Sequence, residues 1–202
     1  MQAKEIHALL SALTLRLSQC AGQGVAETLA RYNQHSLADE SFRAPAPQAQ
    51  AVVRFLPDAL ADARIFNPAI ASAIATIAPH LRWVQTAAYS DALLGKGFTQ
   101  NYAWCDLIGP QGFFPGHDFI MGLLMLGPQQ HYKDHFHPAP ELYWPLTAPS
   151  LWRKGDSAFV PRQRGEVIWH PANVIHATKT LDKPLLAVWT WTQDTATAAR
   201  LA

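Results

Sequence analysis

Hydrophobic residues recur at helical spacing through the first part of the chain. In the opening twenty residues the apolar positions that follow this spacing are Ile6, Leu9, Leu10, Leu13 and Leu17. A second short helix is predicted in GVAETLARYNQH, and the proline-rich stretch 44–50 is typical of a connector. PDALADAR and PAIASAIATIAPHL are rich in alanine and have proline near their starts, where a helix tolerates it. Residues 1–90 are therefore predicted to form a helical segment.

The pattern changes at about Phe98, where short aromatic and aliphatic segments replace the helical spacing. These segments are FTQNYAWCDLIG, DFIMGLLMLG, ELYWPL, SLWRK, SAFVPR, EVIWH, HATKTL and LLAVWTWT. Gly, Pro, Asp and Asn separate them, as expected for strands joined by turns. Many short, closely spaced strands predict a sandwich or a small barrel, so the fold class is mainly β. We expect one domain over 1–202, in which the helices cover one edge or face of the barrel.

Composition and charge exclude several classes of protein. Hydrophobic residues make up 49% of the chain, which is enough for a packed core. The net charge is +1, and no run of Lys or Arg is long enough to follow a phosphate backbone, so a nucleic-acid partner is not expected. The opening helix carries polar residues, unlike a signal peptide, and no apolar run is long enough to span a bilayer. We expect a soluble, cytoplasmic protein with no membrane partner.

Histidines gather in the second half, where five of the nine fall within residues 131–176. His135 and His137 are two apart, so on a strand both side chains point to one face. Glu141 follows after two prolines that would bend the chain, and His176 lies beyond a predicted turn in GEVIWHPANVIHATKT. Imidazole and carboxylate ligands together suit Zn, Fe(II), Mn or Co. These residues are therefore candidate ligands of one divalent metal ion.

The complete spacing resembles the two motifs of the cupin superfamily. The first motif is His135-x-His137-x3-Glu141, and the second is Gly165-x5-Pro171-x-Asn173-x2-His176, with Asn173 where glycine is usual. The resemblance covers residues 98–195 and implies a double-stranded β-helix barrel. It also implies that the barrel holds a metal ion through His135, His137, Glu141 and His176.

The remaining histidines do not fall at positions of these two motifs. His131 and His170 are interpreted as loop residues or as residues that support the site from outside it. His117 is expected in a turn. His7, His35 and His80 fall in the helical segment and are interpreted as ordinary surface or hydrogen-bonded histidines.

Aromatic residues close to the motifs are candidates for catalysis and substrate binding. Tyr143 lies two residues after Glu141, hence on the same strand face, where it either fills the barrel or becomes a phenolate beside a cation. A phenolate there would be a metal ligand or a strong base. Tyr132 supplies a second phenol near the mouth of the site. Trp189 and Trp191 share one face of a predicted terminal strand, which is either core or pocket wall. Further pocket candidates are Tyr89, Tyr102 and Trp104.

The stretch HYKDHFHPAPELYWPL, with WTWT downstream, resembles the cupin-type dimethylsulfoniopropionate (DMSP) lyases of marine bacteria, closest to the DddQ group. The resemblance implies that His137, Glu141, Tyr143 and His176 lie at the metal, with His135 at or beside it. It places Tyr132 and Trp191 in the substrate pocket. The implied activity is that of a carbon–sulfur lyase, which cleaves zwitterionic DMSP to dimethyl sulfide and acrylate by β-elimination. The metal would be Zn, Fe(II) or Mn, with Tyr143 as the base and Tyr132 orienting the carboxylate.

Three other functions stay open. An Fe(II) cupin dioxygenase uses the same ligand types but requires O₂. A non-enzymatic, metal-dependent small-ligand sensor has little need of Tyr143. A sugar-phosphate isomerase or epimerase needs basic residues in the barrel, whereas the basic cluster at 153–164 stands outside the motifs. A homodimer through the helical segment is compatible with the sequence.

Overall fold

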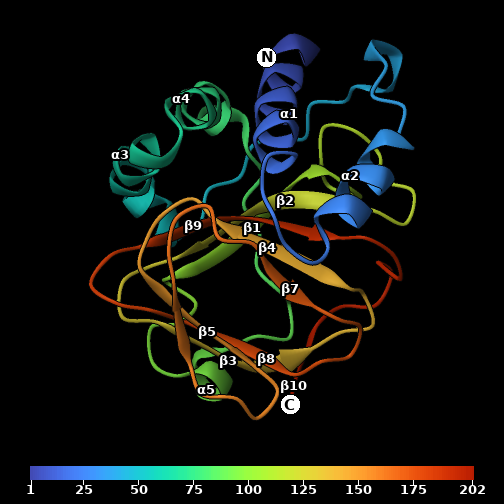
Figure 1. The fold of residues 1–202 in the computed structure, drawn as a ribbon. Helices are drawn as coiled ribbons and strands as arrows, with labels where there is room; N and C mark the ends of the chain where they lie inside the picture. The colour runs from blue at the N-terminus through green and yellow to red at the C-terminus, as the bar shows by residue number, and fades with distance from the viewer.

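The computed structural model describes residues 1–202, and its helices are concentrated in the N-terminal part of the chain (Figure 1). The α-helices are α1 (Ala3–Leu17), α2 (Val25–Asn33), α3 (Leu56–Phe66), α4 (Pro68–Ile77) and α5 (Asp91–Leu94). Three short 3₁₀ helices lie between them, at Asp39–Ser41, Ala51–Phe55 and Ala78–His80. The four longer α-helices confirm the predicted helical stretches, whereas α5 had no clear pattern. None of the helices has the length and apolar character needed to cross a membrane.

Ten strands form two five-stranded antiparallel sheets. They are β1 (Tyr102–Ile108), β2 (Ile120–Leu126), β3 (His131–Phe136), β4 (Glu141–Pro145), β5 (Ser150–Lys154), β6 (Val160–Arg162), β7 (Ile168–His170), β8 (His176–Thr180), β9 (Leu185–Trp191) and β10 (Arg200–Leu201). One sheet has the order β1-β2-β9-β4-β7, and the other has the order β10-β3-β8-β5-β6. From β2 onward the chain changes sheet at every connection except that between β5 and β6, which confirms the predicted double-stranded β-helix.

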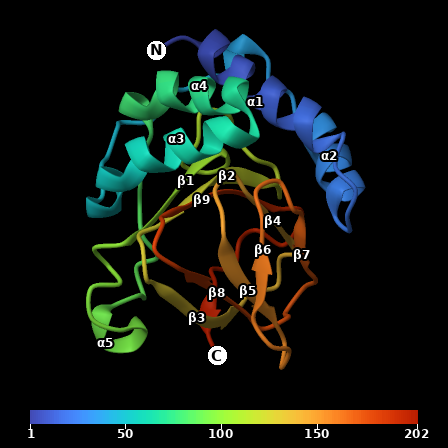
Figure 2. The same ribbon diagram turned by 60° about the vertical axis from the view of Figure 1, so that its left-hand side comes forward.

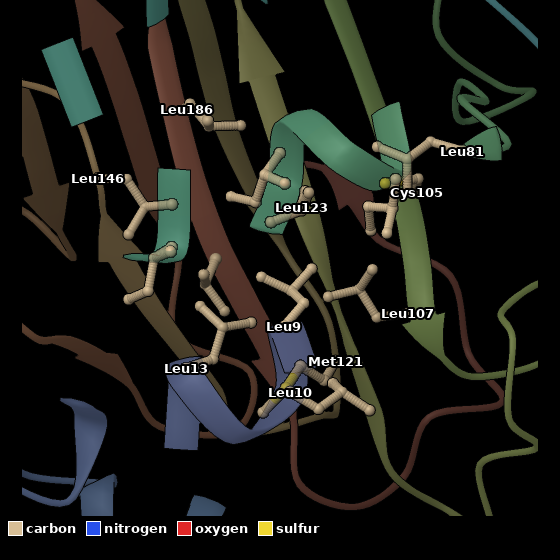
Figure 3. Close-up of a cluster of buried hydrophobic side chains, with 14 of the residues drawn as sticks. Leu9, Leu10, Leu13, Leu81, Cys105, Leu107, Met121, Leu123, Leu146 and Leu186 are labelled. Atoms are coloured by element: carbon tan, nitrogen blue, oxygen red, sulfur yellow. The ribbon is translucent and has the colours of Figure 1, made fainter. Parts of the chain in front are cut away.

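Helices α1 to α4 lie over the outer face of the first sheet, and the second sheet lies on the opposite side of the barrel, with α5 beside its strand β3 (Figures 1 and 2). Leu9, Leu10 and Leu13 of α1 point toward this outer face, where Met121 and Leu123 of β2 meet them (Figure 3). These residues belong to a buried cluster of 32 residues drawn from helices and strands alike. The expectation that the helices pack on a face of the barrel is therefore confirmed.

Alternate residues of the covered sheet point to opposite sides. In β9, Leu186 and Val188 belong to the core beneath the helices, whereas Leu185, Ala187 and Trp189 belong to a second cluster inside the barrel. Both faces are thus buried, so β2 and β9 are continuous apolar runs rather than alternating ones.

The prediction that Trp189 and Trp191 stand on a terminal strand is wrong. Their strand, β9, is central in its sheet, between β2 and β4, and the short strand β10 follows it in the chain. The apolar composition of β9 is that of a central strand, and β10 is too short to leave a readable pattern.

Asp62 joins the helical layer to the barrel. This buried carboxylate on α3 accepts hydrogen bonds from the Arg164 side chain, at 3.0 Å for Nε, and from the Ala148 amide, also at 3.0 Å. Lys183 Nζ lies 3.7 Å away. Burial alone would raise the pKa of Asp62, but the bonds from Arg164 and Ala148 and the two nearby cations lower it below its ordinary value.

We therefore expect Asp62→Asn to lower the free energy of unfolding by about 2 kcal/mol at pH 7, since charged hydrogen bonds are lost. This difference in unfolding free energy between variant and wild type should have its full size above the unfolded-state pKa of Asp62, near 4. It should disappear as the pH falls through the lower folded-state pKa. Urea unfolding at several pH values measures it. Asp58→Asn, an exposed change on the same helix, should cost less than about 1 kcal/mol; equal losses would contradict the role of Asp62.

Candidate active site

Three of the predicted ligands meet inside the barrel. His137 follows β3, Glu141 begins β4 and His176 begins β8, and their ligand atoms lie within 4.8 Å of one another. Glu141 Oε2 is 3.1 Å from His137 Nε2 and 3.2 Å from His176 Nε2. All three side chains are buried. Residues from three separate strands or strand ends therefore converge on one point.

The orientation of both imidazoles fits a cation at this point. His137 Nδ1 donates to the carbonyl of Ala139 at 2.8 Å, and His176 Nδ1 donates to the carbonyl of Val174 at 2.9 Å. When the rings are neutral, each Nε2 therefore carries a lone pair that faces the carboxylate. Two hydrogen-bond acceptors then face each other with no proton between them, which is unfavourable. A divalent cation among them would remove this conflict, and the backbone carbonyls would fix the rings as they do in known metal sites.

Glu141 is the charged centre of this group. Burial alone would raise its pKa, but when His137 and His176 are protonated their charges and hydrogen bonds hold the pKa of Glu141 well below its ordinary value. Trp191 Nε1 donates to the second carboxylate oxygen, Oε1, at 2.9 Å. The Trp191 ring also packs on His137, with centroids 4.4 Å apart. The carboxylate is thus ionised and oriented from both sides.

His135 stands beside this group rather than within it. Its Nδ1 bonds the carbonyl of Lys133 at 2.8 Å, and its ring stacks on Tyr132 at a centroid distance of 3.8 Å. It also meets the edge of His176 at 4.1 Å, but its ligand atoms are not among those within 4.8 Å of one another. Burial, and then the charge of His176, lowers its pKa well below the ordinary value, so the imidazole is neutral.

An irregularity in β3 brings Tyr132 and His135 to the same side. Residues three apart on a regular strand face opposite ways. The pairing of β3 with β8 shifts register between Tyr132 and His135, and Lys133 and Asp134 take up the extra length. Tyr132 and His135 are both buried and both line the barrel interior. Sequence spacing alone could not have given this bulge.

A cavity of about 380 Å³ opens onto His137 and Glu141, whereas His176 lies behind its lining. Its lining includes Tyr132, His135, His137, Glu141 and Tyr143, and no Lys or Arg lines it. An aromatic wall completes it, made of Tyr102, Trp104, Trp189 and Trp191. Within the wall, Trp189 meets Trp104 and Trp191 nearly edge to face, at 5.8 Å and 5.6 Å. Trp189 and Trp191 are therefore pocket wall rather than closed core.

The tyrosines occupy different places around this cavity. Burial raises the pKa of Tyr143 well above its ordinary value, and the charge of Glu141 raises it further. Burial also raises the pKa of Tyr132. Tyr89 is not part of the cavity wall; its hydroxyl meets that of Tyr132 at 2.9 Å. Tyr102 lines the cavity and its hydroxyl meets Thr86 Oγ1 at 2.9 Å. Tyr89 can thus orient Tyr132 without lining the cavity.

Of the two other histidines near the motifs, one contacts the site and one does not. His170, at the end of β7, is buried, pairs with Glu141 across the strands and stacks on His176 with centroids 4.1 Å apart. Neither ring nitrogen of His170 has a hydrogen-bond partner. His131 instead packs against Phe159 and does not line the cavity. His170 therefore supports the site from behind His176, a contact that only strand pairing reveals.

The family model described as dimethylsulfoniopropionate lyase matches residues 6–187. The chain belongs to the dimethylsulfoniopropionate lyase family. It is 31% identical to dimethylsulfoniopropionate lyase DddQ of Ruegeria pomeroyi over 117 residues, which are 54% of this chain and 55% of that protein. It is 26% identical to the putative dimethylsulfoniopropionate lyase DddL of Cereibacter sphaeroides over 121 residues, or 59% of this chain and 49% of that protein. The chain spans about half the length of these relatives.

Crystal structures of DMSP lyases have the same fold over nearly the whole chain. The structure of DddQ from Ruegeria pomeroyi DSS-3 matches with a TM-score of 0.70 at 24% identity, covering 98% of this chain and 96% of that one. A structure described with the DMSP lyases RdDddP and RnDddQII matches with a TM-score of 0.74 at 22% identity, covering 98% of both chains. The helical segment is thus part of the shared fold and not an addition to the barrel.

The geometry of this family member predicts unequal contributions of the histidines to metal binding. We expect His176→Ala and Glu141→Gln each to weaken Mn(II) or Zn(II) binding by more than about tenfold. Mutation of a residue that only supports a metal ligand already weakens metal binding by about that factor. His135→Ala should weaken it less. Titration calorimetry on metal-free protein measures this, with His131→Ala as the control outside the cavity. A loss with His135→Ala as large as that with His176→Ala would make His135 a full ligand.

Proposed function

We propose that this protein is a metal-dependent lyase that cleaves DMSP to dimethyl sulfide and acrylate by β-elimination. The observation that carries the proposal is a phenol, Tyr143, that lines the same cavity as His137 and Glu141 and is paired with Trp189 of the aromatic wall on the adjacent strand. Membership of the DMSP lyase family supports the substrate, as do relatives that carry this name.

The chemistry of DMSP fits the two ends of this cavity. DMSP has a carboxylate at one end and a permanent dimethylsulfonium cation at the other, and its α-hydrogen is only weakly acidic in water. A divalent cation held by His137, Glu141 and His176 would polarise the substrate carboxylate and favour the phenolate form of Tyr143. His135, beside these ligands, is proposed as a further ligand or as a support for them.

The residues of the chain then have separate roles. Tyr143 removes the proton from the carbon next to the carboxylate, and Tyr132 orients that carboxylate. The electron pair left on carbon forms the new double bond as the carbon–sulfur bond breaks. Sulfur keeps the bonding pair and departs as neutral dimethyl sulfide, and acrylate remains. Trp189 and Trp191 hold the sulfonium beforehand through cation–π contacts, each worth about 0.5–2 kcal/mol.

The proposal predicts that Tyr143→Phe lowers kcat for acrylate formation by about 10²- to 10⁴-fold, since the base is lost. Metal content should be unchanged within a factor of two. Wild-type activity should rise with pH as Tyr143 loses its proton, at a pH set by two opposing effects: burial and Glu141 raise its pKa, and the bound cation lowers it. This rise should be absent from the residual activity of Tyr143→Phe. Acrylate measured by chromatography across pH tests both expectations.

Tyr132→Phe is the matched variant, because it removes the other phenol of the cavity. We expect it to raise KM more than it lowers kcat, since Tyr132 binds the substrate carboxylate and does not remove the proton. If Tyr143→Phe kept near-wild-type activity while Tyr132→Phe abolished it, the two roles would be exchanged.

An Fe(II) dioxygenase is the main competing function, because its ligands are of the same types. We expect cleavage of DMSP to proceed at an unchanged rate without O₂, since β-elimination involves no net oxidation. Purified protein supplied in turn with Fe(II), Mn(II) and Zn(II) would be incubated with DMSP under argon, and dimethyl sulfide measured in the headspace. No dimethyl sulfide or acrylate with any metal would overturn the lyase. A sugar-phosphate isomerase is disfavoured because no Lys or Arg lines the cavity.

A further inference from the structure

A second carboxylate lines the cavity, and no motif pointed to it. Asp106 lies on β1, two residues beyond Trp104 and therefore on the same strand face. It is 4% exposed and forms no ion pair. Its Oδ2 accepts a hydrogen bond from the Gln111 amide at 3.1 Å, whereas Oδ1 is buried without any partner. An ionised, buried carboxylate with no counter-charge is costly, and a cationic ligand in the cavity would offset this cost.

The strand pairing puts Asp106 in one row with the aromatic wall and the proposed base. Asp106 pairs with Gly122, Gly122 pairs with Trp189, and Trp189 pairs with Tyr143. Asp106 and Tyr143 are thus three strand spacings apart, about 14 Å along the backbone of the sheet. Both side chains nevertheless line the same cavity. Asp106 therefore stands on the side of the cavity away from the strand that carries Glu141.

Gly122, which stands between Asp106 and Trp189 in this row, leaves room for the Trp189 indole. A Cβ at Gly122 would stand 2.1 Å from the Cys105 carbonyl oxygen and 2.8 Å from Trp189 Nε1, so only glycine fits under the indole. Trp189 Nε1 is itself buried without a partner. The indole of Trp104 meets that of Trp189 edge to face. An unpaired carboxylate and two indoles thus border one part of the cavity.

We infer that Asp106, together with the faces of Trp104 and Trp189, forms the binding site for the cationic end of the substrate. The inference rests on the proposed function, because it assigns the sulfonium a place. A sulfonium has no N–H or O–H, so it is recognised only by aromatic faces and by a negative charge. No Lys or Arg lines the cavity to neutralise Asp106, which leaves its charge free for the ligand.

Titration of Asp106 is compatible with this role. Burial raises its pKa to about 7, so a large part of the carboxyl is ionised at neutral pH. A cation bound nearby favours the ionised form further.

A structural role for Asp106 uses its other oxygen. Oδ2 caps the turn at 109–112, and a Cβ at Gly109 would lie 2.7 Å from Oδ2. Asp106→Asn keeps an oxygen for the Gln111 amide and removes only the charge. It therefore separates cation binding from support of the turn.

The experiment compares two ligands of equal shape. DMSP is the substrate, and 4-methylpentanoate carries the same carboxylate with an uncharged carbon in place of the sulfonium. In Asp106→Asn we expect KM for DMSP to rise at least about tenfold with a smaller change in kcat. The inhibition constant of 4-methylpentanoate should stay within twofold of wild type. Asp182→Asn, exposed in the turn between β8 and β9, is the matched control and should change neither value.

Two outcomes would overturn the inference. An unchanged KM for DMSP in Asp106→Asn would remove the carboxylate from substrate binding. Equal weakening of both ligands would make its role that of supporting the turn alone. If Asp106→Asn does not fold, as judged by circular dichroism, Asp106→Ser replaces it, since the hydroxyl still accepts from the Gln111 amide.

A binding measurement separates this inference from the proposed activity. Trimethylsulfonium has the cation but no carboxylate and cannot be cleaved by the proposed reaction. We expect it to bind the wild type, detected by tryptophan fluorescence, and to bind Asp106→Asn at least about tenfold more weakly. That result would support the cation site even if wild-type protein failed to cleave DMSP. No binding of trimethylsulfonium to wild-type protein would overturn the cation site whatever the activity.

Discussion

The buried carboxylate of Glu141 is the constraint on which the rest of the site depends. Burying one charge costs several kcal/mol unless the surrounding groups compensate it. Here His137 and His176 face one oxygen and the indole N–H of Trp191 binds the other. These partners come from the end of β3, from β8 and from β9, so the barrel must close for Glu141 to be satisfied. The candidate metal site therefore exists only in the closed barrel.

The helical layer makes this arrangement stable. With α1, α3 and α4 packed on its outer face, the sheet that contains β9 and β4 is held from behind by a large apolar cluster. Its inner face can then carry polar and aromatic groups at little cost to the core. A single strand serves both purposes: in β9, Val188 packs outward, whereas Trp189 lines the cavity. The same layering explains why the related crystal structures match over the helices as well as the barrel.

Strand periodicity was enough to predict the residues that share a strand. It placed Glu141 beside Tyr143 and Trp189 beside Trp191, and the motif spacing connected His176 to them. It could not show which strands are neighbours, so the stacking of His170 on His176 and the row from Asp106 to Tyr143 were out of reach. The bulge that aligns Tyr132 with His135 was missed for a related reason, because it is set by pairing with β8. Contacts between strands depend on the tertiary structure, which strand periodicity does not contain.

Charge along the cavity gives a physical basis for selecting a zwitterion. Glu141 sits with two histidines at one end, where a divalent cation would attract a carboxylate. Asp106 sits near the tryptophans at the other, without a basic neighbour in the lining. An anion with no positive end would leave Asp106 uncompensated, and a cation with no carboxylate would leave the metal side unused. In the proposed binding mode a molecule with both charges satisfies the two groups together, and DMSP is such a molecule.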